Sequence, residues 1–590
     1  MDKRTLLAVV LSVIVITIGF TIQTLMFPPV VPETTDQQTR AVEQVTVPEP
    51  ATTPQVQEPQ PASTQMAGGI VALGQDPANT NPIVFSDNQT FRATIDPRGG
   101  VLRSFELLNH RDGDQPVNMI LPDGSDSYGL RMVFGQWDGQ EITAVFNRET
   151  TNRPNEIRLT RDFAQRGREE SPFRVTLVYT FQPGEYMFEL RVSVTDINRG
   201  IPFINTNDRA YSIVVGPQIG PFFDPSRPGN ARNADFRRFL GFAENRRTVF
   251  SRSNPGNPEV LTNRFSWAAI DGKYFSFVAV PGNANFTTVF ANTMSSQGTP
   301  GNTMALERAP IASSSQEDIF RFYAGPKRDA NLRVYNRASD NQFGIANLRL
   351  DELVDSNFLG WLENILKQGL ELFYLIIPNW GIAIILLTIV VKLLFYPLTK
   401  KSHESTHKMQ ALAPKMKEIQ EKYKDNPQKM NAMVAEMYRK EGVNPLGGCL
   451  PILIQFPFFI AMYGLFNNHF DLRGASFIPG WITDLSSPDV VLEFGFTIPL
   501  LGWTQLHLLP FVYLASQLFY GKVTQQPNAA TQAGSQKMML YMLPIVFFFV
   551  LYSVPSGLLV YWISQNIITM LQQLWVNRHD RFGKSAVKKA

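Results

Sequence analysis

The stretch Asn444-Pro-Leu-Gly-Gly-Cys-Leu-Pro-Ile-Leu-Ile-Gln-Phe-Pro457 leads into an apolar run that covers residues 446–466. At a rise of 1.5 Å per residue, a run of about 20 residues crosses the roughly 30 Å hydrocarbon layer of a bilayer. Similar apolar runs surround it, at 372–396, 499–520, 538–554 and 555–575. We therefore predict an α-helical membrane core with five transmembrane helices.

Three segments of different composition precede this core. Within residues 1–27, an apolar run from Leu6 to Phe27 follows Lys3 and Arg4 and has no Ala-x-Ala-like cleavage site, so the segment predicts an uncleaved signal anchor. Residues 28–82 contain ten prolines among Gln, Thr, Glu and Ala, a composition typical of a disordered linker. Residues 83–350 alternate apolar and polar residues in short runs separated by Pro-Gly and Asp-Gly turns. This pattern predicts a large antiparallel β-sandwich.

The remaining segments connect these parts. Apolar residues at helical spacing in 351–371 predict an amphipathic helix on the membrane surface. Two helical patterns within 397–445, divided by Asp425-Asn426-Pro427, predict a helical hairpin. The other connections are the loops 467–498 and 521–537 and the basic tail 576–590.

Basic residues set the orientation, because Lys and Arg near span ends stay in the cytoplasm. Residues 398–444 carry ten Lys or Arg, whereas 467–496 carry only Arg473. With six spans, both termini are expected in the cytoplasm. The β-domain then lies in the periplasm of a Gram-negative cell, and the protein is a multi-pass protein of the inner membrane.

Overall composition excludes several classes of protein. The chain has 590 residues, 54 Lys and Arg against 51 Asp and Glu, and a net charge of +3, which is too small for a dedicated DNA-binding protein. Its one cysteine, Cys449, excludes an intrachain disulfide and any cysteine-based metal cluster. We find no nucleotide-binding motif and expect no cofactor.

Lys392 is the only formally charged residue in the five C-terminal runs. Its long side chain could reach the cytoplasmic headgroups, or it could stand in a polar cavity inside the bundle. Polar residues in the same runs favour the cavity, because facing lipid would be costly for them. The candidate groove residues are Lys392, Thr388, Gln455, Gln517, Tyr561, Trp562 and Gln565.

A second motif suggests a different class. His403-Glu404-Ser405-Thr406-His407 matches H-E-x-x-H, in which two histidines one turn apart bind zinc and the glutamate activates water. The segment lacks an evident third ligand and is crowded by lysines, so a solvated helix face is the preferred interpretation. A membrane zinc metalloprotease using His403, Glu404 and His407 remains an alternative, as does a polar-solute transporter.

Together with Tyr396-Pro-Leu-Thr-Lys400 and Pro555-Ser-Gly557, the Asn444–Pro457 stretch closely resembles the YidC membrane-protein insertases of Gram-negative bacteria, in the YidC/Oxa/Alb family. The resemblance implies a five-helix core around a hydrophilic groove, with a periplasmic β-supersandwich. It implies insertion and folding of membrane proteins, alone or with the Sec translocon, and no enzymatic activity. Two positions depart from the family: Lys392 stands where arginine is usual, and Trp562 stands where a tyrosine is expected.

The expected mechanism follows from the groove. Lys392 attracts a polar segment of the substrate, and apolar side chains then guide its hydrophobic segment into lipid. The residues of this expected hydrophobic slide are Phe456, Phe459, Met462, Val550 and Leu551. Expected partners are nascent membrane proteins, the bilayer, the Sec translocon with its accessory subunits, and a ribosome or signal recognition particle receptor at the cytoplasmic hairpin and tail.

Overall fold

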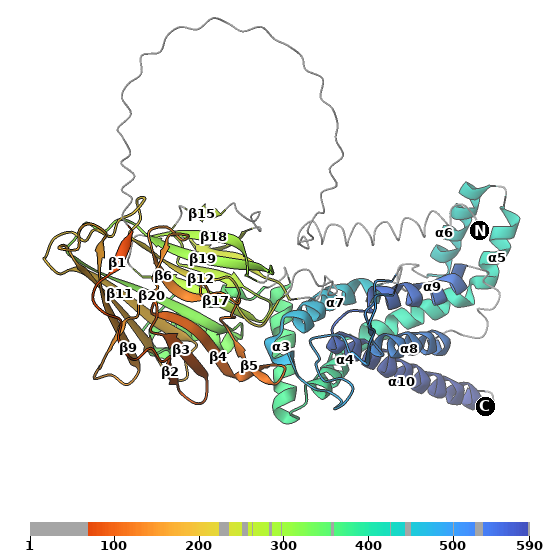
Figure 1. Cartoon of the computed structure of the whole chain (residues 1–590). Helices are drawn as coiled ribbons and strands as arrows, with labels where there is room; N and C mark the ends of the chain where they lie inside the picture. Colours follow the sequence, from red (N-terminus) through yellow and green to blue (C-terminus); the bar gives the residue numbers. More distant parts are fainter. Residues whose placement is uncertain are drawn as a thin grey trace, which may run out of the picture.

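Two packed β-sheets and a bundle of helices form the two parts of the molecule, with helix α3 (Gly360–Ile376) between them (Figure 1). The computed structural model describes residues 69–587, except 224–234, 251–257, 262–263, 283–285, 297, 356–358, 425, 443–449, 499–500 and 525–534. The predicted signal anchor at 1–27 and most of the predicted linker lie outside the described residues.

The β-domain is an antiparallel sandwich, which confirms the predicted β part of the fold. In spatial order, the first sheet contains β1 (Ile70–Ala72), β9 (Glu156–Gln165), β10 (Phe173–Phe181), β11 (Met187–Asp196), β20 (Ser315–Pro326), β17 (Phe275–Pro281), β16 (Trp267–Asp271), β13 (Arg238–Ala243) and β14 (Arg246–Phe250), with β8 (Asn147–Glu149) beside β9. The second contains β15 (Glu259–Leu261), β18 (Phe286–Met294), β19 (Pro300–Arg308), β12 (Tyr211–Gly216), β6 (Gly129–Phe134), β4 (Val101–Asp112), β3 (Phe91–Asp96) and β2 (Ile83–Ser86), with β5 (Gln115–Asn118) beside β4 and β7 (Gln140–Glu141) beside β6.

Aromatic side chains fill the space between the two sheets. Phe91 of β3 stacks on Phe105 of β4, with ring centroids 4.9 Å apart, and Phe105 meets Phe188 of the facing sheet at 5.4 Å. All three rings are buried, as the alternating pattern of these strands predicts. The sandwich therefore has a core of its own, made mostly of residues from its strands.

The predicted boundary at residue 82 is wrong, because the sandwich begins earlier. Strand β1 pairs with β9 in the register Ile70↔Gln165, and the Ile70 side chain is buried. The buried Arg161 guanidinium donates to the carbonyls of Gly74 and Gln75 and so fixes the next residues. The polar composition of 73–82 concealed this short strand within the predicted linker.

The sandwich also extends slightly beyond residue 350. After β20 come α2 (Asp329–Arg333) and three short 3-10 turns, η1 (Val334–Asn336), η2 (Ala338–Asp340) and η3 (Leu350–Leu353). Leu350 and Leu353 belong to the sandwich core. The β-domain therefore ends close to Val354, only a few residues before α3.

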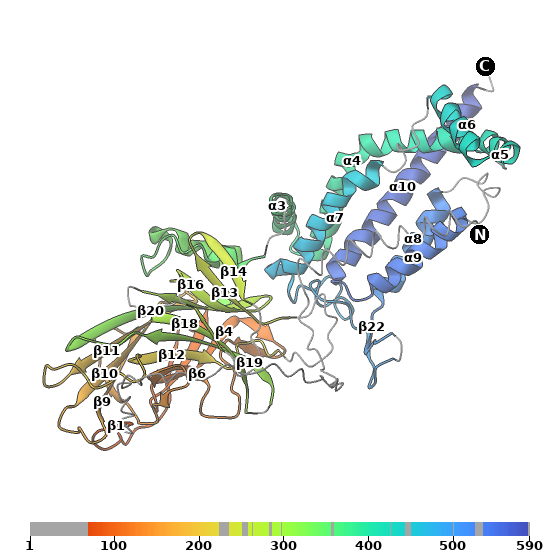
Figure 2. The same ribbon diagram turned by 90° about the horizontal axis from the view of Figure 1, so that it is seen from above.

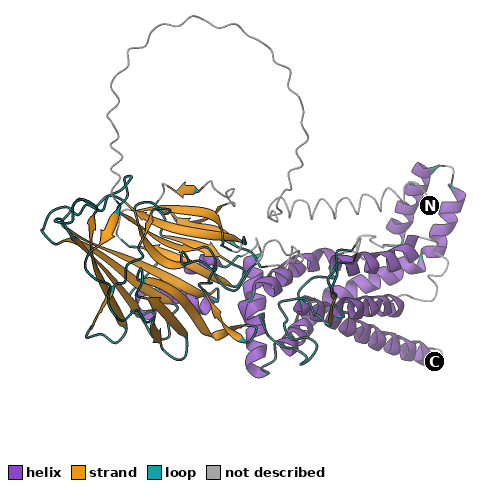
Figure 3. Ribbon diagram, viewed as in Figure 1, coloured by secondary structure: helices purple, strands orange, loops and turns teal. Residues whose placement is uncertain are grey.

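The second part of the molecule is helical. Its elements after α3 are α4 (Trp380–Ala411), α5 (Ala413–Lys422), α6 (Pro427–Lys440), α7 (Leu450–Asn468), η5 (Phe470–Leu472), β21 (Leu492–Glu493), β22 (Gln505–Leu506), α8 (Leu509–Thr524), α9 (Ser535–Val550) and α10 (Ser556–Val587). Helices α4, α7, α8, α9 and α10 run side by side, and α5 and α6 form a hairpin at the end of the bundle that lies away from the β-domain (Figures 1 and 2). Figure 3 shows that most strands lie in one part and most helices in the other, the exceptions being α2 in the β-domain and the β21–β22 hairpin in the helical part.

Helix α3 packs one face against the bundle and exposes another. Leu362, Leu366 and Leu370 are buried against α4 and α7. Trp361 and Ile365 are exposed, which leaves an apolar strip free for a membrane surface. The predicted amphipathic helix is therefore present, but it covers Gly360–Ile376 instead of 351–371, because Leu350–Leu353 form a 3-10 turn packed in the sandwich core.

Several predicted boundaries in the helical part are wrong. Helix α4 continues through Pro397 to Ala411, past the predicted span end at 396, so only α5 and α6 form the hairpin predicted for 397–445. Helix α9 ends at Val550, before the predicted 554, and α10 continues to Val587, past the predicted 575. Residues 372–376 belong to α3, because the chain breaks at Pro378 and Asn379 caps α4 by accepting the Ile382 amide at 3.1 Å. The run 499–520 becomes helical only at Leu509, since the preceding residues form the β21–β22 hairpin, with Gly502 in the left-handed region at φ +68°. Apolar content alone does not distinguish such a hairpin from a helix.

Within the described residues, one helical stretch is both long and apolar enough to cross a membrane unaided, Trp380–Leu398. Helices α8 and α9 have 16 residues each, or about 24 Å at the usual helical rise. The bundle thus agrees with the predicted helical core, while the number of spans remains a prediction.

Candidate functional site

Lys392 stands on the buried side of α4 and faces α10. Its side chain is 9% exposed, and its ammonium donates a 2.9 Å hydrogen bond to the hydroxyl of Thr569 on α10. Thr569 in turn donates to the carbonyl of Gln565 at 2.7 Å. The cation is therefore held inside the bundle by a neutral acceptor.

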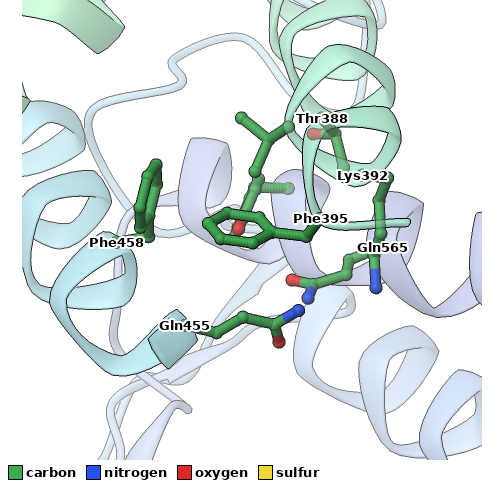
Figure 4. A pocket seen from close by; sticks show the side chains of 8 residues that line it. Thr388, Lys392, Phe395, Gln455, Phe458 and Gln565 are labelled. Atoms are coloured by element: carbon green, nitrogen blue, oxygen red, sulfur yellow. The ribbon is translucent and has the colours of Figure 1, made fainter. Parts of the chain in front are cut away.

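A small recess, with room for about one water molecule behind its open mouth, lies beside Lys392. Helices α4, α7 and α10 line it with Thr388, Val391, Lys392, Phe395, Gln455, Phe458, Tyr561 and Gln565. Figure 4 shows the amides of Gln455 and Gln565 pointing toward each other beside the Lys392 side chain. This lining combines amides and hydroxyls with one cation and contains no carboxylate, so it suits a polar or acidic guest.

Helical periodicity explains why these residues meet. Thr388 and Lys392 are one turn apart on α4, and Tyr561, Gln565 and Thr569 recur at intervals of four on α10. Thr388 donates its hydroxyl proton to the Ile384 carbonyl at 2.7 Å, so its oxygen keeps acceptor capacity toward the recess. The recess is thus built from one polar stripe on each of two facing helices.

Five of the seven predicted groove residues line this recess, and two do not. Gln517 accepts a 2.7 Å hydrogen bond from the Asn566 amide, which joins α8 to α10. The Trp562 ring stacks on Phe459, with centroids 5.1 Å apart and planes 8° from parallel. Gln517 therefore acts between helices, and Trp562 packs against an apolar surface instead of offering a polar contact to the recess.

The five residues of the predicted hydrophobic slide differ in their exposure. Phe456 is 58% exposed, and Phe459 and Val550 are partly exposed. Met462 and Leu551 are buried in the core of the bundle. Only the first three are placed to touch a passing segment.

Sequence reasoning did not find Thr569, Phe395, Phe458 or Val391. Thr569 lies one turn beyond Gln565, so extending the Tyr561–Gln565 spacing by four residues would have identified it. Phe395 and Phe458 meet edge-on at 4.8 Å and close one side of the recess. No sequence signal separates these two rings from ordinary core residues.

The H-E-x-x-H segment lies on the far part of α4, away from this recess. Residues 403–407 belong to the helix that ends at Ala411, but their side chains are outside the described part of the chain. The zinc-protease alternative therefore gains no structural support.

An antiparallel β-sandwich joined to a helical bundle that encloses a buried cation defines a two-part membrane protein, and comparison with known proteins agrees. The model of the 60Kd inner membrane protein family matches residues 372–584, and that of the YidC periplasmic domain matches residues 86–369. Membrane protein insertase YidC of Treponema denticola is 38% identical over 98% of this chain and 99% of its own length. That of Treponema pallidum is 34% identical over 99% of this chain and 100% of its own length.

The chain belongs to the YidC family of membrane protein insertases, inner membrane proteins with a periplasmic domain. A solved structure titled as an active YidC insertase with its first transmembrane domain resolved is 15% identical, covers 86% of this chain and 94% of that chain, and has a TM-score of 0.35. Insertases of this family are not enzymes, and the protease alternative is not favoured.

Proposed function

We propose that this protein inserts membrane proteins by receiving a polar, often acidic, segment of the substrate in the Lys392 recess. The observation that carries the proposal is the buried ammonium, which has a neutral hydroxyl as its hydrogen-bond acceptor. A cation in this setting is stabilised further when an anion approaches, because no carboxylate of the recess lining competes for it. The recess therefore attracts the part of a substrate that lipid repels.

Once the polar segment is held, burial of the hydrophobic segment drives insertion. Transfer of apolar surface out of water contributes about 25 cal/mol per Å², so a transmembrane segment needs no nucleotide to move into lipid. Phe456, Phe459 and Val550 offer the apolar surface along which that segment leaves the protein. Gln455 and Tyr561 keep the polar part solvated meanwhile.

The topology and partners form the wider part of the proposal. Six spans with both termini in the cytoplasm place the α5–α6 hairpin where a ribosome or signal recognition particle receptor would deliver a chain. Leu412 and Met437 form the small core of this hairpin, and Lys415 pairs with Glu441 at 2.7 Å. We also propose that the protein cooperates with the Sec translocon, because the chain belongs to the YidC family.

Reconstitution of the purified chain in liposomes, with a short single-span substrate that carries an acidic residue, tests the role of Lys392. We expect Lys392→Glu to lower insertion at least tenfold, because the reversed charge repels the acidic segment. Lys392→Arg, which keeps the charge, should retain most of the activity. The matched control is Lys400→Glu, the same charge reversal at an exposed position of α4. Full insertion by Lys392→Glu would contradict the proposed electrostatic role.

A further inference from the structure

Three side chains with metal-ligating atoms meet where α3, the end of α7 and the β-domain come together. They are Glu371 of α3, His469 directly after α7, and Asp471 of η5. One ligand atom from each, a ring nitrogen or a carboxylate oxygen, lies within 4.8 Å of the other two. These residues lie outside the Lys392 recess and have no part in the proposed insertion mechanism.

His469 is the member of this cluster that points to a ligand. Its side chain is only 2% exposed, and its Nε2 atom has no hydrogen-bond partner among the described residues. Its Nδ1 atom lies 3.9 Å from the Asp471 carboxylate, which is too far for a hydrogen bond. A buried imidazole without such a bond is costly, and a metal ion shared with Asp471 would bind Nδ1, the ring nitrogen that lies near that carboxylate. The His469 ring follows the C-terminus of α7, where the helix dipole favours a positive charge such as that of a bound metal ion.

Neighbouring cations partly occupy the carboxylates, but they leave room for an ion. Arg328 contacts Oδ1 of Asp471 at 3.0 Å, whereas Oδ2 is the oxygen nearer to His469. Lys367 lies 2.9 Å from Asp329 and 3.9 Å from Glu371, so Asp329 is its closer partner. Arg333 also reaches Asp329 at 3.5 Å, so the three carboxylates Asp329, Glu371 and Asp471 face three cations, and zinc would compete with Arg328 for Asp471 and with Lys367 for Glu371.

We infer that Glu371, His469 and Asp471 form a structural zinc site that fastens α3 to the segment following α7. One imidazole nitrogen with two carboxylate oxygens is a ligand set that Zn²⁺ accepts, with water in the fourth position. Mg²⁺ and Ca²⁺ prefer ligand sets made of oxygen alone. Ligand atoms around tetrahedral zinc are about 3.4 Å apart, so the three side chains need to close by little more than 1 Å.

A zinc ion at this site would strengthen the junction between the β-domain and the helical part. Arg328 and Asp329 follow β20 directly, so the same cluster of charges already connects the β-domain to both helical segments. Zinc would add bonds between α3 and the α7 end of this junction. Bound metal therefore restricts the motion of the interfacial helix against the bundle.

The test uses the full chain in nanodiscs, stripped with a chelator and titrated with Zn²⁺ alone. We expect one zinc per chain at micromolar concentration or below, with at least tenfold weaker binding in Glu371→Gln, His469→Gln and Asp471→Asn. Glu363→Gln on the same helix and His403→Ala in the H-E-x-x-H segment are controls that should bind as the unmodified chain does. Hydrogen exchange of 360–376 and 469–472 should slow when zinc is added.

Three outcomes would overturn the inference. They are the absence of saturable binding below about 100 µM zinc, binding that survives all three cluster substitutions, and binding that is lost in His403→Ala instead. Equal affinity for Mg²⁺ or Ca²⁺ would also contradict it, because the site would then lack the preference that its histidine confers. Because Glu371 is partly exposed, Glu371→Gln remains decisive if the His469 variant does not fold.

Discussion

The Thr569 hydroxyl accepts a hydrogen bond from the Lys392 ammonium and holds it in place. Removing this hydroxyl should therefore change the position of the ammonium in the recess. Thr569→Val keeps the shape of the side chain but leaves the cation without this acceptor. A hydrogen bond to a charged group contributes about 1.5–3 kcal/mol. We expect the ammonium to turn toward the cytoplasmic headgroups and insertion to fall about threefold to tenfold, less than for Lys392→Glu.

Insertion by proteoliposomes at fixed protein content measures this effect. Thr569→Ser is the matched control, because it keeps the hydroxyl and should insert nearly as well as the unmodified chain. If Thr569→Val and Thr569→Ser behave alike, the hydroxyl does not position Lys392.

At the scale of single residues, the sequence identified functional candidates where a residue type was unusual for its surroundings. Lys392 could be found because it is the only charge in its apolar surroundings, and five of the seven chosen polar residues line one recess. Gln517 could not be assigned, since the partner that binds its amide oxygen, Asn566, is known only once α8 and α10 are placed together. Side-chain type shows that a polar group needs a partner, whereas packing determines which partner it has.

Helix α3 carries a carboxyl group whose protonation should affect stability. Burial raises the pKa of Glu363 to about 7, with Asp355 adding to the effect and Lys367 opposing it, and its Oε2 atom has no hydrogen-bond partner among the described residues. The folded state therefore keeps a proton that the unfolded chain loses near pH 4.5. Stability should fall as pH rises from about 4.5 to 7 and should stay at the lower value above that range.

Replacing this carboxyl tests the pH dependence directly. We expect Glu363→Gln to raise the free energy of unfolding by about 2 kcal/mol at pH 8 and to have little effect near pH 4.5. Thermal unfolding in detergent at several pH values measures the difference. Glu371→Gln, measured in a metal-free sample, is the control on the same helix. If Glu363→Gln raised the free energy of unfolding equally at both pH values, the proposed protonation of Glu363 would be refuted.

Element boundaries were harder to predict than element types. The apolar run 499–520 contains both a hairpin and a helix, and the start of α8 is decided by Asp489, whose Oδ2 accepts the amides of Leu508 and Leu509. Since Asp489 is about twenty residues earlier, a local pattern does not reveal this cap. Asn379, by contrast, stands directly before α4 and is a local capping signal that counting apolar residues passed over.

Across the whole molecule, one aromatic side chain connects the helical part to the sandwich. Phe470, two residues beyond α7, is counted in the core of the β-domain and contacts His110 at 5.2 Å and Phe275 at 5.5 Å, both edge-on. Arg473 lies over the Phe275 ring on the same side, and Arg328 pairs with Asp471. This docking was absent from the sequence prediction, because it joins residues of separate domains.

Phe470→Ala should therefore loosen the β-domain from the bundle without unfolding either part. Loss of a buried phenylalanine costs about 3–5 kcal/mol in a domain core, and most of that cost here falls on the contact between domains. Fluorescence energy transfer between one dye on β15 and one on α6, in a Cys449→Ser background, should show a broader range of distances. Phe470→Leu, which keeps an apolar side chain, should stay close to the unmodified distribution. An unchanged distribution in Phe470→Ala would mean that the ion pairs Arg328–Asp471 and Lys367–Asp329 are sufficient for docking.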